Sequence, residues 1–241
     1  MEITHFDPEE IEKFEAMADE WWSPTGKFKP LHQLNPLRLD YIFERIVDGT
    51  MEADDLSILD VGCGGGLLAE NMALRGACVT GVDRSEKALA VAQAHADRSA
   101  GLNLTYHCSD AETWAQTYAV SYDVITCLEV LEHVPDVVRT LQACQTMLKP
   151  GGKLFFATLN RTPKSYLHAI LGAEYLLGWL PKKTHRYDQF IRPSEMVYAL
   201  RQADLQVVDM QGVSYDFLQG TFFLSQDLSV NYLGMAIKAI D

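Results

Sequence analysis

The residues with the clearest potential for chemistry are a run of glycines and an aspartate that follows them. Residues 58–66 read Ile-Leu-Asp-Val-Gly-Cys-Gly-Gly-Gly, so an apolar segment ends in a turn that contains Gly62 and Gly64. Glycines permit φ > 0 and let a ligand lie against the chain where a Cβ would collide. Asp83 stands 21 residues after Gly62, where a carboxylate can accept both hydroxyls of a ribose. This spacing predicts a nucleoside site, and a turn that needs glycine only for packing is the structural alternative.

The spacing favours S-adenosylmethionine over a dinucleotide. A dinucleotide fingerprint, G-x-G-x-x-G, would need a third glycine at position 67, where this chain has Leu67. Asp60 precedes the first glycine by two residues and would repel a pyrophosphate, whereas a sulfonium and an ammonium favour a carboxylate there. The D-x-G-x-G-x-G pattern resembles the first motif of the class I S-adenosylmethionine-dependent methyltransferases. It argues against a dehydrogenase.

A second group of polar residues follows the apolar segment 122–128. Glu129, Glu132 and His133 come directly after it, at the end of a predicted strand, where ligands sit in open α/β sheets. If these residues form a helical turn, their side chains share one face. The trio could then hold a hard cation such as Mg²⁺, or His133 could act as general base for a phenol with a glutamate orienting it. A structural role at the start of the next helix is the third interpretation.

The periodicity of apolar residues predicts the elements that position these groups. Seven strands are expected, near 57–61, 78–83, 103–108, 122–127, 152–158, 205–215 and 228–239. Helices are expected at 66–75, 85–99, 136–148 and from Pro193, and two more precede the first strand, from Asp7 to about Trp22 and from Asn35-Pro36 onward. This alternation implies an α/β protein with a parallel sheet that is covered on both faces.

Composition narrows the class of protein. The 241 residues are 48% hydrophobic and 22% charged, which is typical of a globular domain. A net charge of −13 argues against nucleic acid as a partner, because phosphate neutralisation needs a basic face. The five cysteines form no C-x-x-C pair, and no apolar run suits a signal peptide or a bilayer span, which predicts a cytoplasmic protein with reduced thiols.

Several stretches outside the cofactor motif are typical of one family. They include Trp21-Trp22, Phe28 to His32, Asn35 to Arg38, Leu59 to Leu67, Glu129 to Pro135, Thr158 to Arg161, Gly172 to Tyr175 and Val230 to Tyr232. With these the chain resembles the ubiquinone-biosynthesis O-methyltransferase family from about Glu9 to Tyr232. The resemblance implies a Rossmann-like class I methyltransferase fold, with a mostly parallel seven-stranded sheet and helices on both faces. We expect one domain over 1–241, with N-terminal helices at about 8–50.

The resemblance also implies an activity and a set of site residues. Family members use S-adenosylmethionine to methylate catechol-type hydroxyls of polyprenylated benzenoid intermediates, so the expected partners are a polyprenylated catechol or quinol and a ubiquinone-biosynthesis complex. Contacts with S-adenosylmethionine are implied for Arg38, Gly62, Asp83 and Leu128. Relatives have a divalent metal at the positions of Glu129, Glu132 and His133. In this class an acidic residue at Asp110 often accepts from the adenine amino group, although Asp110 could equally cap the helix that follows it.

The segment 161–192 differs in charge from the rest of the chain. It has a net charge of +4, and the remainder has −17. Its apolar runs contain Tyr and Trp, which suit the lipid headgroup region. A basic-flanked apolar helix of this length lies on a membrane rather than across it, so peripheral association with the inner face of the membrane is expected. A lid over the substrate cleft, or core packing, is the alternative.

Other functions stay open at this stage. A methyltransferase that acts on another small phenol or on carbon would carry the same cofactor motif. A non-catalytic scaffold subunit of a lipid-synthesis complex is a different class, but retention of Asp60, Gly62, Gly64 and Asp83 together with the Glu/His trio argues against a dead cofactor site. S-adenosylhomocysteine should stabilise an active chain against heat by mass action, and NAD should not.

Overall fold

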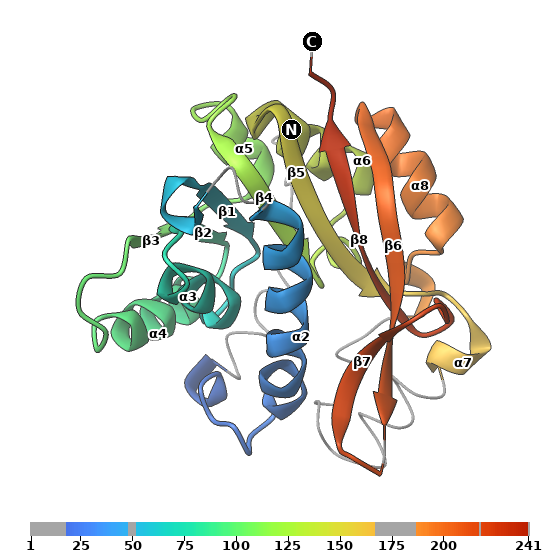
Figure 1. Ribbon diagram of the computed structural model, residues 1–241, viewed down its shortest axis with the longest axis horizontal. Helices are drawn as coiled ribbons and strands as arrows, with labels where there is room; N and C mark the ends of the chain where they lie inside the picture. Colours follow the sequence, from blue (N-terminus) through green and yellow to red (C-terminus); the bar gives the residue numbers. More distant parts are fainter. Residues whose placement is uncertain (1–17, 48–51, 167–186, 217, 241) are drawn as a thin grey trace.

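The centre of the molecule is an eight-stranded sheet with strand order β3-β2-β1-β4-β5-β8-β6-β7 (Figure 1). The computed structural model describes residues 18–47, 52–166, 187–216 and 218–240. The strands are β1 (Ser57–Val61), β2 (Cys78–Asp83), β3 (Leu104–Cys108), β4 (Tyr122–Leu128), β5 (Leu148–Leu159), β6 (Leu205–Asp216), β7 (Thr221–Ser225) and β8 (Asn231–Lys238). The first five in spatial order run parallel, and β8, β6 and β7 are each antiparallel to their neighbours. The predicted Rossmann-like α/β fold is confirmed.

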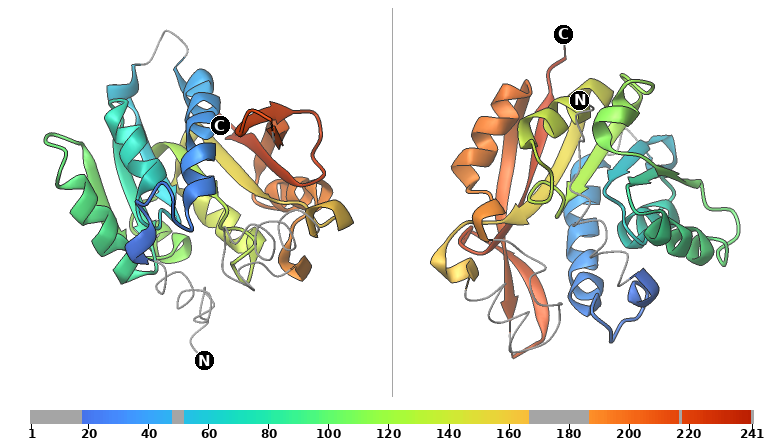
Figure 2. Two further views of the ribbon diagram at one scale, coloured as in Figure 1. Left: turned by 90° about the horizontal axis from the view of Figure 1, so that it is seen from below. Right: turned by 180° about the vertical axis from the view of Figure 1, so that it is seen from behind.

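Helices cover both faces of the sheet, as the sequence predicted (Figures 1 and 2). Those of the described chain are α2 (Lys29–Ile46), α3 (Leu67–Leu74), α4 (Glu86–Ala96), α5 (Ala111–Ala115), α6 (Val137–Met147), α7 (Pro163–Ser165) and α8 (Pro193–Gln202), with short 3-10 turns at Ala18–Glu20, Ala53–Asp55 and Tyr187–Gln189. One core cluster joins the sheet to α2, α3 and α4 through Leu34, Met72 and Leu89. The other joins it to α6 and α8 through Leu141 and Met196. Burial on both faces explains why the central strands are continuous apolar runs.

The structure adds one strand to the seven that were predicted. The segment after Asp216 turns back sharply, because the Asp216 side chain accepts hydrogen bonds from the backbone N–H groups of Leu218 and Gln219. Gly220 completes the turn with φ +68, and its N–H donates to the Asp216 carbonyl. β7 then pairs with β6 from Thr221 to Ser225. The predicted last strand, 228–239, is correspondingly shorter and begins at Asn231.

Helix α2 begins earlier than predicted, at Lys29 rather than near Asn35, and Pro36 lies inside it. Pro36 is tolerated because it falls on the exposed face with Asp40 and Glu44, where a missing N–H is less costly. Of the helix expected from Asp7 to Trp22, residues 1–17 lie outside the described residues, and Ala18–Glu20 form a 3-10 turn. The described parts contain no helix with the length and apolar character to span a bilayer.

Candidate active site

The glycine turn after β1 lies at the carboxyl edge of the parallel strands, as predicted. Gly62, Gly64 and Gly66 all have positive φ, at +71, +51 and +82. The N–H of Gly62 donates to the carbonyl of Val82, which ties the turn to β2. A Cβ at Gly62 would overlap Cγ2 of Val130, so this glycine also allows the segment after β4 to pack closely. The turn thus has the backbone that the motif requires.

Trp21 fills the space next to two of these glycines. A Cβ at Gly64 would overlap Cζ2 and Cη2 of its indole, and a Cβ at Gly65 would overlap Cγ and Cδ1. Trp21 is 8% exposed and stacks on Phe28 at 4.1 Å between ring centroids. Because these glycines have no Cβ, an aromatic side chain of the protein itself packs directly against the backbone of the turn. Sequence reasoning placed Trp21 in a family stretch and gave it no role.

Asp83 ends β2 and faces the glycine turn. Its Oδ2 accepts the N–H of Gly64 at 2.8 Å, and its Oδ1 accepts the N–H of Ser85 at 2.8 Å. Burial raises the pKa of Asp83, while these backbone hydrogen bonds act to lower it. Each carboxylate oxygen can accept more than one hydrogen bond, so both oxygens could still receive ribose hydroxyls.

Asp60 is a buried carboxyl within β1, 3% exposed. Its Oδ1 accepts the hydroxyl of Thr126, on the neighbouring strand β4, at 2.6 Å. Burial raises the pKa of Asp60 to about 7; the hydrogen bond from Thr126 lowers it, and the charge of Asp83 raises it further. A positive ligand nearby would favour the ionised form of this group.

Arg38 and Glu129 form an ion pair that joins α2 to the end of β4. The Nη2 of Arg38 donates to Oε1 of Glu129, and the Nδ2 of Asn231, at the start of β8, donates to the same oxygen at 3.0 Å. The Arg38 side chain is 7% exposed, and its buried Nε has no hydrogen-bond partner within the described residues. A buried guanidinium with an unused donor could receive a carboxylate of a ligand. Asn231, like Thr126, is separated by many residues from the groups it contacts, so local spacing gave no signal for either.

The Glu129–His133 segment does not form the helical turn under which its three side chains would share one face. Glu129 has φ +57, in the left-handed region, and only a tight turn follows, in which the N–H of His133 donates to the Val130 carbonyl. The three side chains therefore do not share a helix face. Glu132 is buried and accepts the hydroxyl of Thr158 at 2.8 Å. Burial and the neighbouring Glu129 raise the pKa of Glu132 well above its usual value, which favours the neutral acid.

This arrangement does not fit the metal that the family resemblance implied. No group of three His, Cys, Asp or Glu side chains in the described part of the chain is placed to hold a metal ion. Glu129 is already paired with a cation, Arg38, and the same oxygen also accepts the side-chain amide of Asn231. We therefore derive no catalytic step through a metal at these residues.

Asp110 and Leu128 also lie at the edge of the sheet where they were expected. Asp110 caps α5, its Oδ1 accepting the N–H of Thr113 at 2.7 Å, and its Oδ2 lies 3.6 Å from Nη1 of Arg84. The helix-cap interpretation of Asp110 thus describes its contacts within the protein. Leu128 is the last residue of β4 and packs against the cluster that contains α2.

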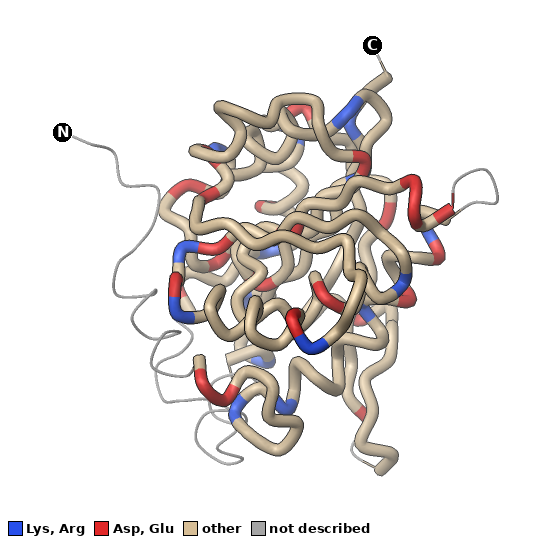
Figure 3. The backbone as a smooth tube through the Cα atoms, turned by 90° about the vertical axis from the view of Figure 1, so that its left-hand side faces the viewer, with Lys and Arg blue, Asp and Glu red and all other residues tan. Residues whose placement is uncertain are grey.

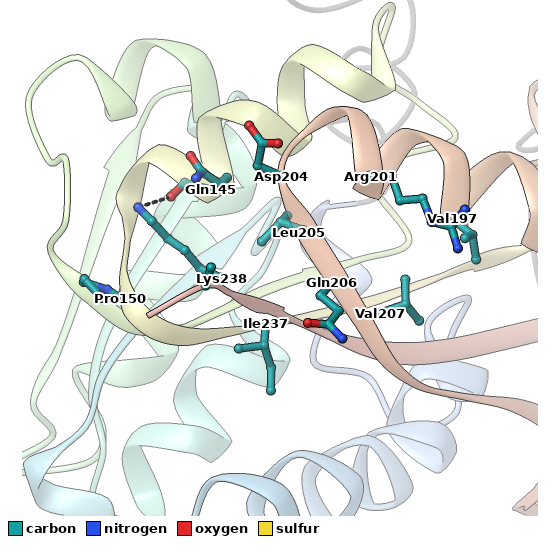
Figure 4. Close-up of a pocket in the computed structure, with 11 residues that line it drawn as sticks. Gln145, Pro150, Val197, Arg201, Asp204, Leu205, Gln206, Val207, Ile237 and Lys238 are labelled. Carbon is teal, nitrogen blue, oxygen red and sulfur yellow. Dashed lines mark hydrogen bonds between the residues drawn. The ribbon is translucent and has the colours of Figure 1, made fainter. Parts of the chain in front are cut away.

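A groove of about 880 Å³ lies at the other edge of the sheet (Figure 4). Pro150, Leu205 and Lys238 line it, near the amino ends of β5 and β6 and the carboxyl end of β8. The Nζ of Lys238 is already bound, because it donates to the carbonyls of Gln145 and Leu148 at 2.9 and 2.8 Å. None of the residues predicted for cofactor or catalysis lines this groove.

The fold and the glycine turn define the class of protein: this chain is an S-adenosylmethionine-dependent methyltransferase. A family model described as a methyltransferase domain matches residues 31–210. Among solved structures, the fold is similar to a methyltransferase from Methanosarcina mazei, with a TM-score of 0.60 and 22% identity over 81% of this chain and 98% of that one. It is also similar to magnesium protoporphyrin IX methyltransferase from Synechocystis with bound S-adenosylhomocysteine, with a TM-score of 0.60 and 19% identity over 85% of this chain and 83% of that one.

Curated relatives narrow this class to one family. The ubiquinone biosynthesis O-methyltransferase of Acinetobacter baylyi is 49% identical over 238 residues, which cover 99% of this chain and 98% of that protein. The corresponding protein of Marinobacter nauticus is 52% identical over 235 residues, which cover 97% and 96%. The chain belongs to the ubiquinone biosynthesis O-methyltransferase family, as the sequence motifs predicted.

Proposed function

We propose that this enzyme transfers the methyl group of S-adenosylmethionine to a catechol-type hydroxyl of a polyprenylated benzenoid intermediate in ubiquinone biosynthesis. One observation carries the site proposal: the glycine turn, Asp83 and the Arg38–Glu129 pair all lie at the carboxyl edge of the parallel strands. Ligands of open α/β sheets bind at this edge. Membership in the family supports the choice of reaction and substrate.

In this proposal different residues bind different parts of the cofactor. The glycine turn, with Gly62 and Gly64, and the carboxylate of Asp83 hold the ribose. Arg38 receives the methionine carboxylate through its unused Nε. Asp60 provides a carboxyl whose ionised form is favoured when a cationic cofactor binds.

Two further residues complete the proposed cofactor site. Leu128 offers an apolar side chain at the end of β4, and Asp110 lies after β3, where it could accept the adenine amino group while it caps α5. Both positions come from the family or class resemblance, and their contacts within the protein are compatible with that use.

The reaction is a displacement at the methyl carbon. We propose His133 as the base that takes the proton of the catechol hydroxyl. The oxygen then attacks the methyl carbon in line, the carbon–sulfur bond breaks, and its electron pair stays on sulfur to give S-adenosylhomocysteine and an aryl methyl ether. Holding the two reactants in line supplies much of the rate. Glu129 acts on this step by holding Arg38, and hence the cofactor, in position.

The test is transfer of a labelled methyl group from S-adenosylmethionine to a short-chain prenylated catechol, with and without EDTA and then with added Mg²⁺. Because Glu129 is paired with Arg38, we expect an oxygen-methylated product and activity that survives EDTA. If EDTA abolishes activity and Mg²⁺ restores it, the interpretation of Glu129, Glu132 and His133 as metal ligands would be supported instead. Binding of S-adenosylhomocysteine without transfer to any catechol would favour a methyltransferase acting on carbon, or the scaffold.

Peripheral contact with the inner membrane face is the second part of the proposal. Its basis is the sequence of the segment 161–192, of which 167–186 lie outside the described residues. A polyprenyl tail that stays in the bilayer would require the enzyme to work at the membrane surface. Association with other enzymes of the pathway at that surface is part of the same hypothesis.

A further inference from the structure

Trp21 carries a buried hydrogen-bond donor that has no partner among the described residues. Its Nε1 makes no hydrogen bond with any described residue, and its side chain is 8% exposed. An indole N–H can only donate, so the group that satisfies it must be an acceptor. Buried donors without acceptors are rare in proteins and call for an explanation, often a ligand or a water that the protein holds.

The position of this donor follows from the ring atoms on either side of it. Nε1 is bonded to Cδ1 and Cε2. Cδ1 overlaps the position that a Cβ of Gly65 would take, and Cε2 lies 3.2 Å from that of Gly64. The N–H is therefore next to the Gly64–Gly65 peptide. The N–H of Gly64 donates to Asp83, so the indole and the proposed ribose carboxylate both contact the same short turn.

The segment 18–28 holds this tryptophan firmly. Nε1 of the neighbouring Trp22 donates to the carbonyl of Gly65 at 2.9 Å, and its ring stacks on His95 of α4 at 3.4 Å between centroids. Nδ1 of His95 lies 2.8 Å from Oε2 of the buried Glu70 on α3. Nε2 of His32 is within 2.9 Å of the Trp21 carbonyl. These contacts fix the segment to the glycine turn and to α4, so the donor is preorganised.

We propose that Trp21 is a cofactor-binding residue whose indole N–H donates to an oxygen of bound S-adenosylmethionine, on its ribose or its methionine carboxylate. The inference rests on the proposed cofactor site at the carboxyl edge. It adds a contact from Trp21, which precedes the first strand by more than thirty residues and lies outside the glycine motif and Asp83. The segment 18–28 then closes the cofactor site as part of its wall.

The experiment uses S-adenosylhomocysteine binding to the full-length protein. In Trp21→Phe the ring still packs on the glycines and on Phe28, but the N–H is lost, so we expect affinity to fall about tenfold, the value of one good hydrogen bond. Trp114→Phe is the matched control. Its indole N–H donates at 2.9 Å to Tyr122, the first residue of β4, so this hydrogen bond lies toward the amino edge of the sheet and its loss should leave affinity unchanged.

A direct readout comes from the indole N–H resonances of the four tryptophans in ¹⁵N-labelled protein. The Trp21 resonance should shift on addition of S-adenosylhomocysteine. It can be identified by its absence in the spectrum of Trp21→Phe. If that variant does not fold, the Trp→Phe variants of the other three tryptophans assign the remaining resonances and leave that of Trp21 by elimination. Wild-type affinity in Trp21→Phe with an unmoved Trp21 resonance would overturn the inference and leave the proposed function intact. Failure of the wild type to bind S-adenosylhomocysteine would overturn the site itself.

Discussion

At the scale of single residues, the site is built from carboxyls in unusual environments. Asp60 is buried in the middle of a strand with one hydroxyl partner, Thr126, and Asp83 lies against backbone N–H groups. Burying a carboxylate is unfavourable unless it is neutralised or paired. Such groups cost stability in the empty protein and gain a partner when a cation binds. Their presence is consistent with a site for a sulfonium cofactor.

The titration of Asp60 predicts a pH dependence of stability. Its folded pKa of about 7 lies above the usual 3.8, so between these values the folded state binds more protons than the unfolded state. The contribution of Asp60 to the free energy of unfolding is therefore fully present below about pH 3.8 and is lost as the pH rises through about 7.

The variant Asp60→Asn isolates this contribution, because its side chain keeps the acceptor for Thr126 and has no charge. Between pH 5 and pH 8 the free energy of unfolding of the variant should therefore rise relative to that of the wild type by about 2–3 kcal/mol. Denaturant unfolding at both pH values measures this, and a constant difference would contradict it.

Sequence reasoning could place Asp60, Gly62 and Asp83 together in one candidate site because the strand–turn–helix unit fixes their relative positions within a short stretch. It could not identify Asn231, which reaches Glu129 from a strand that enters the sheet more than a hundred residues later. Trp21 was missed for a similar reason. Its contact with the turn depends on how the segment before α2 folds back, which no periodic pattern encodes.

At the scale of elements, α2 and the segment before it position the site. Asn35 donates to the carbonyl of Leu67 at 3.2 Å, and Arg38 pairs with Glu129, so one helix spans the edge from the glycine turn to the end of β4. Its apolar side, which includes Ile42, packs into the core beneath. Displacement of α2 would therefore move the cofactor contacts together.

The packing of Trp21 on the glycine turn can be tested by a double-mutant cycle. Gly65→Ala places a Cβ inside the indole ring, so we expect a loss of stability of about 1–3 kcal/mol. Combined with Trp21→Ala, that clash is absent, and the two effects should be non-additive by about 1–3 kcal/mol. The control pairs Gly65→Ala with Trp114→Ala, which should be additive. Additivity in both cycles, measured by denaturant unfolding, would refute the contact.

The boundaries of most elements follow from hydrophobic periodicity, and the failures have identifiable causes. The start of α2 was placed at Pro36 because proline usually marks a first turn, although Pro30 already serves there. The spacing i, i+3 and i+4 of Glu129, Glu132 and His133 gives a shared face only if the segment is helical. A left-handed Glu129 removes that face, and non-glycine residues rarely take this conformation.

At the scale of the whole molecule, charge is unevenly distributed along the chain. Acidic and basic residues are interspersed over the side of the described chain in Figure 3. In the sequence, by contrast, the segment 161–192 carries +4 against −17 elsewhere. An anionic bilayer would attract this segment and repel the rest, which would orient the enzyme on the surface.

Neutralising two lysines of this segment should weaken membrane binding. We expect Lys182→Gln/Lys183→Gln to reduce the partition coefficient onto anionic vesicles, measured by co-sedimentation, by roughly 30-fold, since each basic residue near the surface contributes about 1 kcal/mol. Lys27→Gln/Lys87→Gln is the control, because it changes net charge equally at two lysines that are already paired with Glu20 and Asp19. Equal binding by the two variants would argue that the segment does not bind lipid.

The central claim is that the carboxyl edge of the parallel strands, between Arg38 and Asp83, holds the cofactor. The most direct measurement is an experimental structure of the complex with S-adenosylhomocysteine. We expect ribose hydroxyls on the Asp83 carboxylate, the amino-acid carboxylate on Nε of Arg38 and the Trp21 indole within hydrogen-bonding distance of a ligand oxygen. Cofactor bound elsewhere, such as in the groove beside Lys238, with Arg38 and Asp83 making no contact to it, would show that the carboxyl edge is not the cofactor site.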